Sequence, residues 1–297
     1  MSIFVDEHTR VVYQGLSPRP GNQGLFYAMR NRDYGTKVVA GTNPGRGGTT
    51  LEGLPIFATV AEAKAQTGAN ASCIFVPAPG VAGAVLEAAE AGMELIVVIS
   101  EGVPLHDEAQ FYRRLRRDFP QSRLLGPNCP GLISPGKCNI GITAGEIATP
   151  GGPVGIVSRS GTLTYQALYE LTQAGIGQTT CVGIGGDPVP GTSFIDCLEA
   201  FQADPQTGVV ILIGEIGGAE EERAAEFIAK EMSKPVVAYI AGVTAPPGRK
   251  MGHAGAIISG SQGTAQAKME ALRAAGVRVA LNPSQLGQLV GEILSGG

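Results

Sequence analysis

Apolar and polar positions along the first half of the chain predict alternating strands and helices. Short runs rich in Val, Ile and Leu end at glycine or proline, as strands do where a loop begins. These runs lie at residues 9–15, 36–45, 71–79, 93–102 and 122–131. Helix-length segments lie between them, at residues 24–35, 81–92 and 107–119. Apolar strands separated by helices predict a parallel sheet covered on both faces, so we predict a Rossmann-like domain over residues 1–147.

The same rhythm restarts after the Gly/Pro-rich residues 145–153. Further strands are predicted at residues 154–158, 178–186, 208–218, 234–242 and 277–284. Helices are predicted between them at residues 162–175, 193–204, 220–232 and 263–276. Residues 148–297 therefore form a second predicted domain, a flavodoxin-like, doubly wound parallel sheet, and the whole chain is predicted to be α/β. In such sheets ligands bind beyond the carboxyl ends of the strands, so the residues that follow each strand are the functional candidates.

Composition and charge argue against two classes of protein. The chain is 43% hydrophobic, yet no apolar run reaches the roughly 18 to 20 residues that cross a bilayer, so we predict no membrane contact. A formal charge of −4 provides no electrostatic footprint for nucleic acid. Residues 1–10 have neither the apolar core of a signal peptide nor the Arg-rich, acid-poor bias of a transit peptide. We therefore predict a cytoplasmic protein.

Two departures from average composition bear on function. Charged residues make up only 16% of the chain, where about 25% is usual, and there are 44 glycines. Few charges suggest that another chain covers part of the surface, and abundant glycine suggests loops that bring bare backbone close to a ligand. An ordinary Gly-rich α/β enzyme is the alternative explanation of both features. The 5 cysteines are scattered without CxxC spacing, so they are interpreted as reduced thiols, and no metal site is predicted.

Two loops of the first domain are candidate anion sites. Residues 14–24 follow the first strand and lead into a helix, whose free N–H groups and positive dipole end favour a phosphate. The spacing is not GxGxxG, and Pro18 and Pro20 have no N–H to donate, although Arg19 could restore positive charge. Arg46 lies in a second glycine-rich turn, after the second strand. A solvated surface turn is the alternative interpretation of the first loop.

In the second domain Ser160, Gly161 and Thr162 lie between a buried strand and the start of a helix. Their N–H and hydroxyl groups suit a phosphoryl group or a carboxylate, whereas a capped helix without a ligand is the alternative. A serine nucleophile would require GxSxG, and Ser158 stands where that motif has its first glycine. The nucleophile hypothesis is therefore disfavoured.

A carboxylate and a histidine complete the candidates at this sheet edge. Glu215 ends a strand among glycines, in contrast to residues 220–222, a glutamate run that we predict to be solvated. His253 lies on the loop after the next strand. A neutral imidazole attacks phosphorus well when a carboxylate holds its other nitrogen, and Glu215 could do so. A lone histidine is more often structural, but Glu215 and Ser160 at the same edge favour a catalytic role.

Several long motifs follow one another in register along the whole chain. In order they read "GPNCPG", "IVSRSGTLTY", "GIGGDP", "DPQT", "IGEIGG", "YIAGVTAPPG" and "MGHAGAII". With these motifs the chain resembles the α subunits of succinyl-CoA synthetases, which are nucleoside-diphosphate-forming succinate–CoA ligases. The resemblance implies a CoA-binding first domain and a second domain whose phosphohistidine is His253, stabilised by Glu215.

The same resemblance assigns the remaining candidate residues. It implies that Tyr165 lies near the substrate and that the turn of Ser160, Gly161 and Thr162 opens a helix pointing at the phosphoryl group. For CoA it implies the following residues: Ser17, Gly21, Asn22, Gln23, Arg46, Ile99, Ser100 and Glu101.

The implied reaction has three reversible steps. A nucleoside triphosphate phosphorylates the histidine, the phosphoryl group passes to a carboxylate as an acyl phosphate, and the CoA thiol displaces phosphate to form a thioester. The nucleotide, ATP or GTP with Mg²⁺, belongs to a β subunit with an ATP-grasp domain. That obligate partner would also account for the low charge fraction. The choice between ATP and GTP, and between αβ and α2β2 assembly, stays open.

The chain departs from the family pattern at three places near ligands. Residues 18–20, "PRP", are inserted between Ser17 and Gly21, Arg46 replaces the usual lysine, and residues 144–151 lack the histidines that the family often has there. Succinate is the expected acid, with malate or citrate as alternatives. A CoA-binding regulatory subunit without turnover is a second hypothesis. An NAD-dependent oxidoreductase is the third and weakest, because no GxGxxG with a following acidic residue is present.

Overall fold

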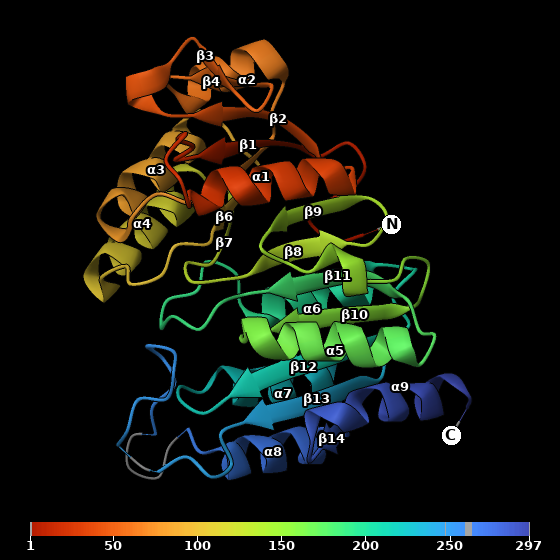
Figure 1. The fold of residues 1–297 in the computed structure, drawn as a ribbon. Helices are drawn as coiled ribbons and strands as arrows, with labels where there is room; N and C mark the ends of the chain where they lie inside the picture. Colours follow the sequence, from red (N-terminus) through yellow and green to blue (C-terminus); the bar gives the residue numbers. More distant parts are fainter. Residues whose placement is uncertain (1, 247, 259–262, 297) are drawn as a thin grey trace.

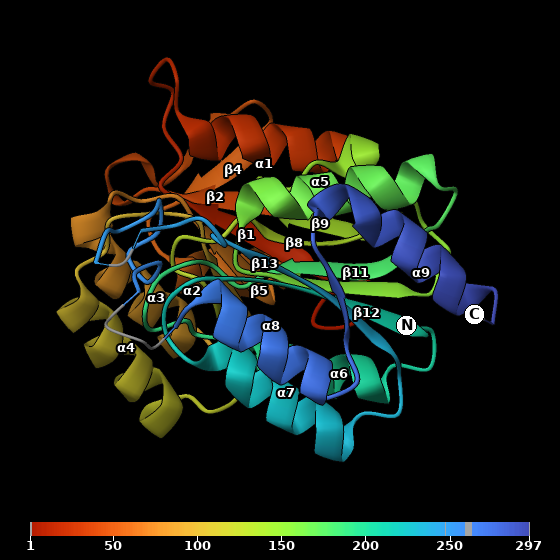
Figure 2. The same ribbon diagram turned by 90° about the horizontal axis from the view of Figure 1, so that it is seen from below.

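The computed structural model describes residues 2–246, 248–258 and 263–296. Two seven-stranded sheets lie one above the other, with the chain passing from the first to the second near its middle (Figure 1). Seen from below, the strands of both sheets form a central layer, with α1, α5 and α9 on one side of it and α6, α7 and α8 on the other (Figure 2). None of the described helices is both long and apolar enough to cross a membrane.

The first sheet has the strand order β3-β4-β2-β1-β5-β6-β7. Its strands are β1 (Arg10–Gln14), β2 (Lys37–Thr42), β3 (Thr49–Leu51), β4 (Leu54–Phe57), β5 (Ala71–Ile74), β6 (Leu95–Val98) and β7 (Arg123–Leu125). All neighbours are parallel except β3, which forms an antiparallel hairpin with β4. Without β3, this is the order of a Rossmann fold, so the predicted fold class of the first half is confirmed.

The helices around this sheet are α1 (Gln23–Tyr34), α2 (Val60–Thr67), α3 (Ala78–Glu90) and α4 (Leu105–Asp118), with the 3-10 turn η1 (Pro44–Arg46). Helix α1 begins where the side chain of Asn22 accepts a hydrogen bond from the Leu25 amide, and it ends at Gly35 in the left-handed conformation. Its buried residues Gly24, Ala28 and Asn31 share one face, so the start of α1 is held against the carboxyl ends of the strands.

The second sheet has the order β14-β13-β12-β10-β11-β8-β9. Its strands are β8 (Gly131–Ser134), β9 (Cys138–Gly141), β10 (Val154–Ser158), β11 (Gln178–Gly183), β12 (Val209–Glu215), β13 (Val236–Ala241) and β14 (Arg278–Ala280). The strands from β10 to β14 are parallel in flavodoxin-like order, and β8 and β9 add an antiparallel edge. The predicted fold of the second half is confirmed, with a hairpin that was not predicted.

The helices of this half are α5 (Gly161–Gln173), α6 (Phe194–Ala203), α7 (Glu220–Glu231), α8 (Ala265–Ala274) and α9 (Leu286–Leu294), with the 3-10 turns η2 (Gly145–Ile147) and η3 (Pro283–Gln285). Helix α5 buries Thr164, Ala167, Leu168 and Leu171, a spacing that places all four on one face. Its first turn consequently stands at the end of β10, beside the ends of β11 and β12.

The unpredicted hairpin bears on where the two halves meet. Strands β8 and β9 precede residue 147, yet β8 pairs with β11 of the second sheet. The backbone N–H of Ile3 also donates to the Thr180 hydroxyl of the second sheet, at 3.1 Å. The chain has therefore left the first sheet by Gly131, and a domain division between residues 147 and 148 stays a prediction.

Each sheet has one point where the strand order reverses direction. In the first sheet this point lies between β1 and β5, and in the second between β10 and β12. Loops after such neighbouring strands separate to opposite faces of the sheet and leave a crevice between them. Gly15, Phe75 and Arg159 directly follow β1, β5 and β10, and Glu215 is the last residue of β12. The predicted site loops therefore lie at the two crevices.

Candidate active site at the sheet edges

His253 and Glu215 are in direct contact. The Nδ1 atom of His253 lies 2.9 Å from Oε1 and 2.8 Å from Oε2 of Glu215, the last residue of β12. The carboxylate side chain is 8% exposed and the imidazole 27%. Because an ionised carboxylate only accepts hydrogen bonds, Nδ1 carries the hydrogen, and Nε2 is the atom left for chemistry. The hydrogen bond to Glu215 also raises the pKa of His253 above 6.5.

The backbone after β11 supports the imidazole from its other side. A Cβ built on Gly186 would lie 2.2 Å from both Cγ and Nδ1 of His253, so the ring occupies space that only a glycine leaves. The Gly255 amide donates to the Gly186 carbonyl at 3.2 Å and ties the histidine loop to this backbone. The orientation of His253 therefore depends on two strand ends, those of β11 and β12.

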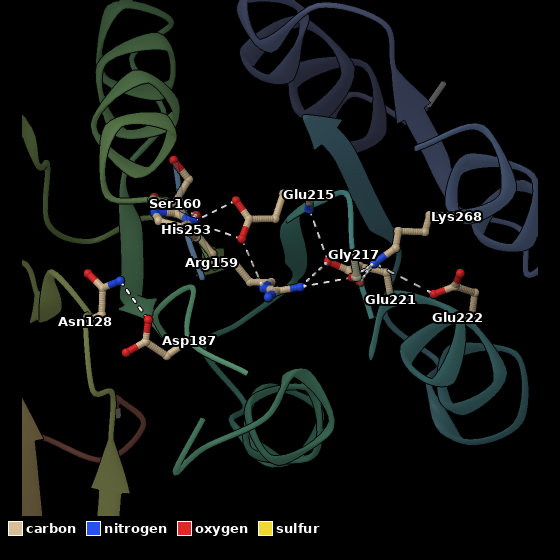
Figure 3. Close-up of polar contacts among 11 residues, drawn as sticks. Asn128, Arg159, Ser160, Asp187, Glu215, Gly217, Glu221, Glu222, His253 and Lys268 are labelled. Atoms are coloured by element: carbon tan, nitrogen blue, oxygen red, sulfur yellow. Dashed lines mark hydrogen bonds and ion pairs between the residues drawn. The ribbon is translucent and has the colours of Figure 1, made fainter. Parts of the chain in front are cut away.

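Behind Glu215 lies a row of buried charges (Figure 3). Arg159 Nε is 3.5 Å from Glu215 Oε1, and Arg159 Nη1 is 3.5 Å from Glu221 Oε1. Lys268 Nζ pairs with Glu221 on the far side. Our prediction that residues 220–222 are solvated is wrong for Glu221, whose side chain is 0% exposed. The first turn of α7 places it inward, because the helix packs this side against α8 and the end of β12.

A carboxylate pair lies on the opposite side of the histidine. The side-chain amide of Asn128 donates to Asp187 Oδ1 at 2.9 Å (Figure 3). Asp187 also faces Glu108, a buried residue of α4. Burial, together with the hydrogen bond and negative charge of Asp187, raises the pKa of Glu108 to about 8. Glu108 consequently carries a proton over much of the range in which ordinary glutamates are ionised.

A cavity of about 540 Å³ opens in front of His253 and is lined by loops of both sheets. Most of the predicted site residues line it: Asn22, Gln23, Ile99, Ser100, Glu101, Ser160, Gly161, Thr162 and His253. At its second-sheet side the first turn of α5 presents the start of a helix, where Ser160 caps the Leu163 amide at 3.3 Å. Free amides at such a start attract anions, so the cavity combines a nucleophile with an anion site.

A second cavity, of about 820 Å³, adjoins the first on the side of the first sheet. Ser17, Gly21, Asn22 and Arg46 line it, and Arg19 of the inserted "PRP" lies there as well. Asn22 lines both cavities, so the two are neighbours. Its side-chain oxygen accepts from the Leu25 amide, its side-chain amide donates to the Gly15 carbonyl, and its backbone N–H donates to the Arg19 carbonyl. The second hydrogen of the side-chain amide is therefore what Asn22 can offer a ligand.

Two predicted residues lie outside both cavity linings. Glu215 stands behind the histidine, as the predicted orienting role requires. Tyr165 donates its hydroxyl to the Ile142 carbonyl at 2.9 Å, and Ile142 lines the smaller cavity. The structure therefore places Tyr165 next to the cavity wall.

Arg159, Glu221 and Lys268 were not predicted as site residues. For Lys268 a signal was present in the sequence. It shares a helix face with the apolar residues Ala265, Met269 and Leu272, and a charge at such a position requires a buried partner. For Glu221 no signal was present, because its neighbours Glu220 and Glu222 are also acidic.

Comparisons with known proteins show similarity along nearly the whole chain. Residues 6–102 match the model of a CoA binding domain, and residues 157–278 match that of a CoA-ligase. The chain is 55% identical over 99% of its length to the succinate–CoA ligase [ADP-forming] subunit alpha of Aquifex aeolicus, covering 95% of that protein. It is 56% identical to subunit alpha 2 of Archaeoglobus fulgidus, covering 99% of this chain and 100% of that one. The Staphylococcus aureus subunit is 53% identical, over 98% and 95% of the two chains.

Solved structures share the fold at lower identity. An ATP citrate lyase from Methanosaeta concilii in complex with (3S)-citryl-CoA superimposes with a TM-score of 0.86 at 27% identity, and 99% of this chain corresponds to 50% of that one. A dinucleotide-forming acetyl-coenzyme A synthetase from Ca. Korarchaeum cryptofilum has a TM-score of 0.72 at 24% identity, over 93% and 58% of the two chains. The second similarity is one of fold alone.

Proposed function

The chain belongs to the family of succinate–CoA ligase α subunits, and from that premise we propose that His253 carries the phosphoryl group of the reaction. The observation that supports this most strongly is the contact of Nδ1 with Glu215 at a cavity that both sheets line. It holds the imidazole in the tautomer whose Nε2 can attack phosphorus.

Together with a partner subunit the chain is an acid–thiol ligase: succinate, CoA and a nucleoside triphosphate give succinyl-CoA, the diphosphate and phosphate. The relatives are named for ADP formation, so we propose ATP as the nucleotide. We propose that the partner is a β subunit whose ATP-grasp domain holds ATP and Mg²⁺. The metal ion there would neutralise phosphate charge. We further propose a cytoplasmic location and a division of the chain between residues 147 and 148.

In the first step Nε2 of His253 attacks the γ-phosphorus, a P–N bond forms, and the P–O bond to ADP breaks. The electron pair comes from Nε2 because the ring hydrogen stays on Nδ1, which donates it to Glu215. The positive charge that develops on the ring faces a carboxylate 2.8 Å from Nδ1, which stabilises it. Gly186 behind the ring limits its rotation.

In the second step an oxygen of the succinate carboxylate attacks phosphorus, the P–N bond breaks, and its electron pair returns to Nε2. The product is an acyl phosphate. We propose that the turn of Ser160, Gly161 and Thr162 binds the anionic oxygens, since the start of α5 lies in the same cavity as His253. The proposed place of the substrate beside Tyr165 is supported by the hydrogen bond of Tyr165 to Ile142 in the cavity wall.

In the third step the CoA sulfur attacks the acyl carbon, the C–O bond to phosphate breaks, and the thiol proton leaves with phosphate. We propose that CoA lies across both cavities. Its phosphates would lie in the larger one near Ser17, Gly21, Arg46 and the amide of Asn22. Its thiol arm would pass Gln23 and residues 99–101 toward His253 in the smaller one.

The test is phosphorylation of the assembled complex with labelled ATP in the absence of CoA. We expect phosphate that is stable to base and labile to acid, located on His253 by peptide mapping at neutral pH. Adding succinate and CoA should discharge it, with succinyl-CoA formed in step. A complex that turns over while phosphate is found only on another residue contradicts the proposal.

A further inference from the structure

The buried charges behind Glu215 form a continuous row whose signs alternate. From the interior outward they are Lys268, Glu221, Arg159 and Glu215, and the row ends at His253 (Figure 3). The Lys268 and Glu221 side chains are 0% exposed. Burying so many charges is unfavourable unless each is paired, and here each one is. Apolar side chains of similar size would stabilise a fold at least as well as buried ion pairs, so the row points to a role in the site.

Glu221 is the member that contacts both the interior lysine and the groups next to the imidazole. Its Oε2 pairs with Lys268, and its Oε1 lies 3.5 Å from Arg159 Nη1. The same Oε1 accepts a hydrogen bond from the backbone amide of Glu215 at 3.1 Å. Glu221 therefore contacts both the arginine beside the Glu215 carboxylate and the backbone from which that carboxylate extends.

The chain leaves room for this carboxylate. A Cβ on Gly214 would lie 2.5 Å from Cγ and 2.7 Å from Oε1 of Glu221. Lys268 is fixed in turn, because its ammonium also donates to the Gly217 carbonyl at 2.6 Å. The positions of Glu221 and Lys268 are thus determined by backbone on both sides of Glu215.

The distances around Arg159 indicate what the row does. Arg159 stays 3.5 Å from Glu215 Oε1 and 3.5 Å from Glu221 Oε1, whereas His253 Nδ1 lies 2.8 Å and 2.9 Å from the Glu215 oxygens. A guanidinium with one carboxylate as its only partner would close into a bidentate pair. Closure on Glu215 would occupy the oxygens that accept the Nδ1 hydrogen.

We propose that Glu221 and Lys268 are positioning residues of the phosphoryl-transfer reaction: they hold Arg159 between two carboxylates, so that the oxygens of Glu215 stay available to His253. This inference rests on the proposed role of His253. Lys268 compensates the charge of Glu221 and also lies 3.9 Å from Oε2 of Glu222, whose side chain is 28% exposed (Figure 3). Without Glu221, Arg159 would keep the Gly217 carbonyl but have Glu215 as its one carboxylate partner in the row, and closer pairing with it would weaken the hold of Glu215 on the imidazole.

The test compares Glu221→Gln with the double variant Glu221→Gln/Lys268→Met, each assembled with the partner subunit. The double variant leaves no unpaired lysine in the interior, so it decides the matter if the single variant does not assemble. Glu226→Gln is the matched control, because it makes the same charge change at an exposed position of the same helix. Binding of CoA, whose phosphates are proposed to lie in the larger cavity, reports whether the fold is intact.

The readout is the titration of His253, followed by NMR with isotope-labelled histidine in this chain and an unlabelled partner. The exposed His8 and His106 provide internal references. The charged groups that act on the His253 ring are Glu215, Arg159 and Asp187. We expect both variants to lower the pKa of His253 by roughly one unit, since Arg159 then counteracts Glu215 more strongly. We also expect phosphorylation to slow by roughly 10- to 100-fold, as displaced catalytic groups usually cause.

The control variant, the reference histidines and CoA affinity should stay unchanged. If the wild type is phosphorylated on His253 while both variants titrate and react like it, the positioning role is refuted and the row only stabilises the fold. If the wild type itself carries no phosphate on His253, the proposed function fails first, which is a distinguishable result.

Discussion

Around the larger cavity the charged side chains lie at the surface, whereas around His253 they are buried and paired with one another. Arg19 and Arg46 are exposed, on loops shaped by glycine and proline. Glu215 and Arg159 are each 8% exposed, and their positions follow from the ends of adjacent parallel strands. The difference shows that this chain fixes in advance the groups proposed to act on phosphorus, and leaves exposed those proposed to hold CoA.

The two tasks explain this difference. Groups that stabilise charge in a transition state are effective when they are already oriented and shielded from water. A long, charged ligand such as CoA is held by several separate contacts, and its phosphates can be met by flexible, exposed arginines. Changes near His253 should therefore impair chemistry and spare CoA binding, and changes near Arg19 should do the reverse.

The largest effect is expected for His253→Ala. Without the nucleophile no phosphoryl group can be carried, so both labelling by ATP and formation of succinyl-CoA should be abolished. CoA affinity should stay within about 2-fold, because the CoA phosphates are proposed to lie in the larger cavity, which His253 does not line. His106→Ala, which removes an exposed histidine of α4, is the matched control and should behave as wild type. Turnover that survives in His253→Ala would overturn the assignment of the nucleophile.

A large but incomplete loss of the His253 phosphorylation rate is expected for Glu215→Gln. The amide keeps the shape but loses the charge that holds the imidazole, so phosphorylation should slow by roughly 100-fold with CoA affinity near wild type. The Glu215 hydrogen bond raises the pKa of His253, and only the neutral ring attacks phosphorus. The acidic limb of the rate profile should therefore lie above pH 6.5 in the wild type and move to lower pH in the variant. A limb that does not move would assign Glu215 another role, with Glu226→Gln as the control.

A moderate loss of CoA affinity is expected for Arg19→Ala, which changes the larger cavity. If Arg19 pairs with a CoA phosphate and replaces the donors missing at Pro18 and Pro20, its loss should weaken CoA binding by about 1.5 to 3 kcal/mol, roughly 10- to 150-fold. His253 phosphorylation without CoA should be unaffected. Titrations at two salt concentrations measure this, with Arg113→Ala, an exposed residue of α4, as the control. If wild type and Arg19→Ala bind CoA with equal affinity at both salt concentrations, "PRP" is only a spacer.

The sequence predicted the strands and helices of both sheets better than it predicted the charges of the site. Apolar runs such as residues 208–218 form buried parallel strands because their pattern is local and unambiguous. Strands β3, β4, β8 and β9 were missed, since each is only three or four residues long, and helices α2 and α9 were missed as well. His253 and Glu215 were predicted together, because residues after parallel strands share one edge.

The burial of Glu221 could not be predicted, because it depends on partners distant in the sequence. Lys268 is 47 positions away, and the two meet only when α7 and α8 pack together. A glutamate inside an acidic run is usually solvated, so the local pattern predicted the opposite. Only the apolar neighbours of Lys268 indicated a buried charge.

The smallest effect on catalysis, with a measurable one on stability, is expected for Glu108→Gln, at the contact between α4 and the loop after β11. Glu108 Oε2 accepts no hydrogen bond among the described residues, and its pKa is raised from 4.5 to about 8 by burial and Asp187. Between these values the folded state binds more protons than the unfolded state, so the stability contributed by this group falls as pH rises. Glutamine donates to Asp187 without ionising. Glu108→Gln should therefore gain roughly 1 to 3 kcal/mol at pH 8 and little near pH 4.5, with unchanged His253 phosphorylation. Chemical unfolding at the two pH values measures this against Glu226→Gln, and a gain that does not depend on pH would show that Glu108 is not the titrating group.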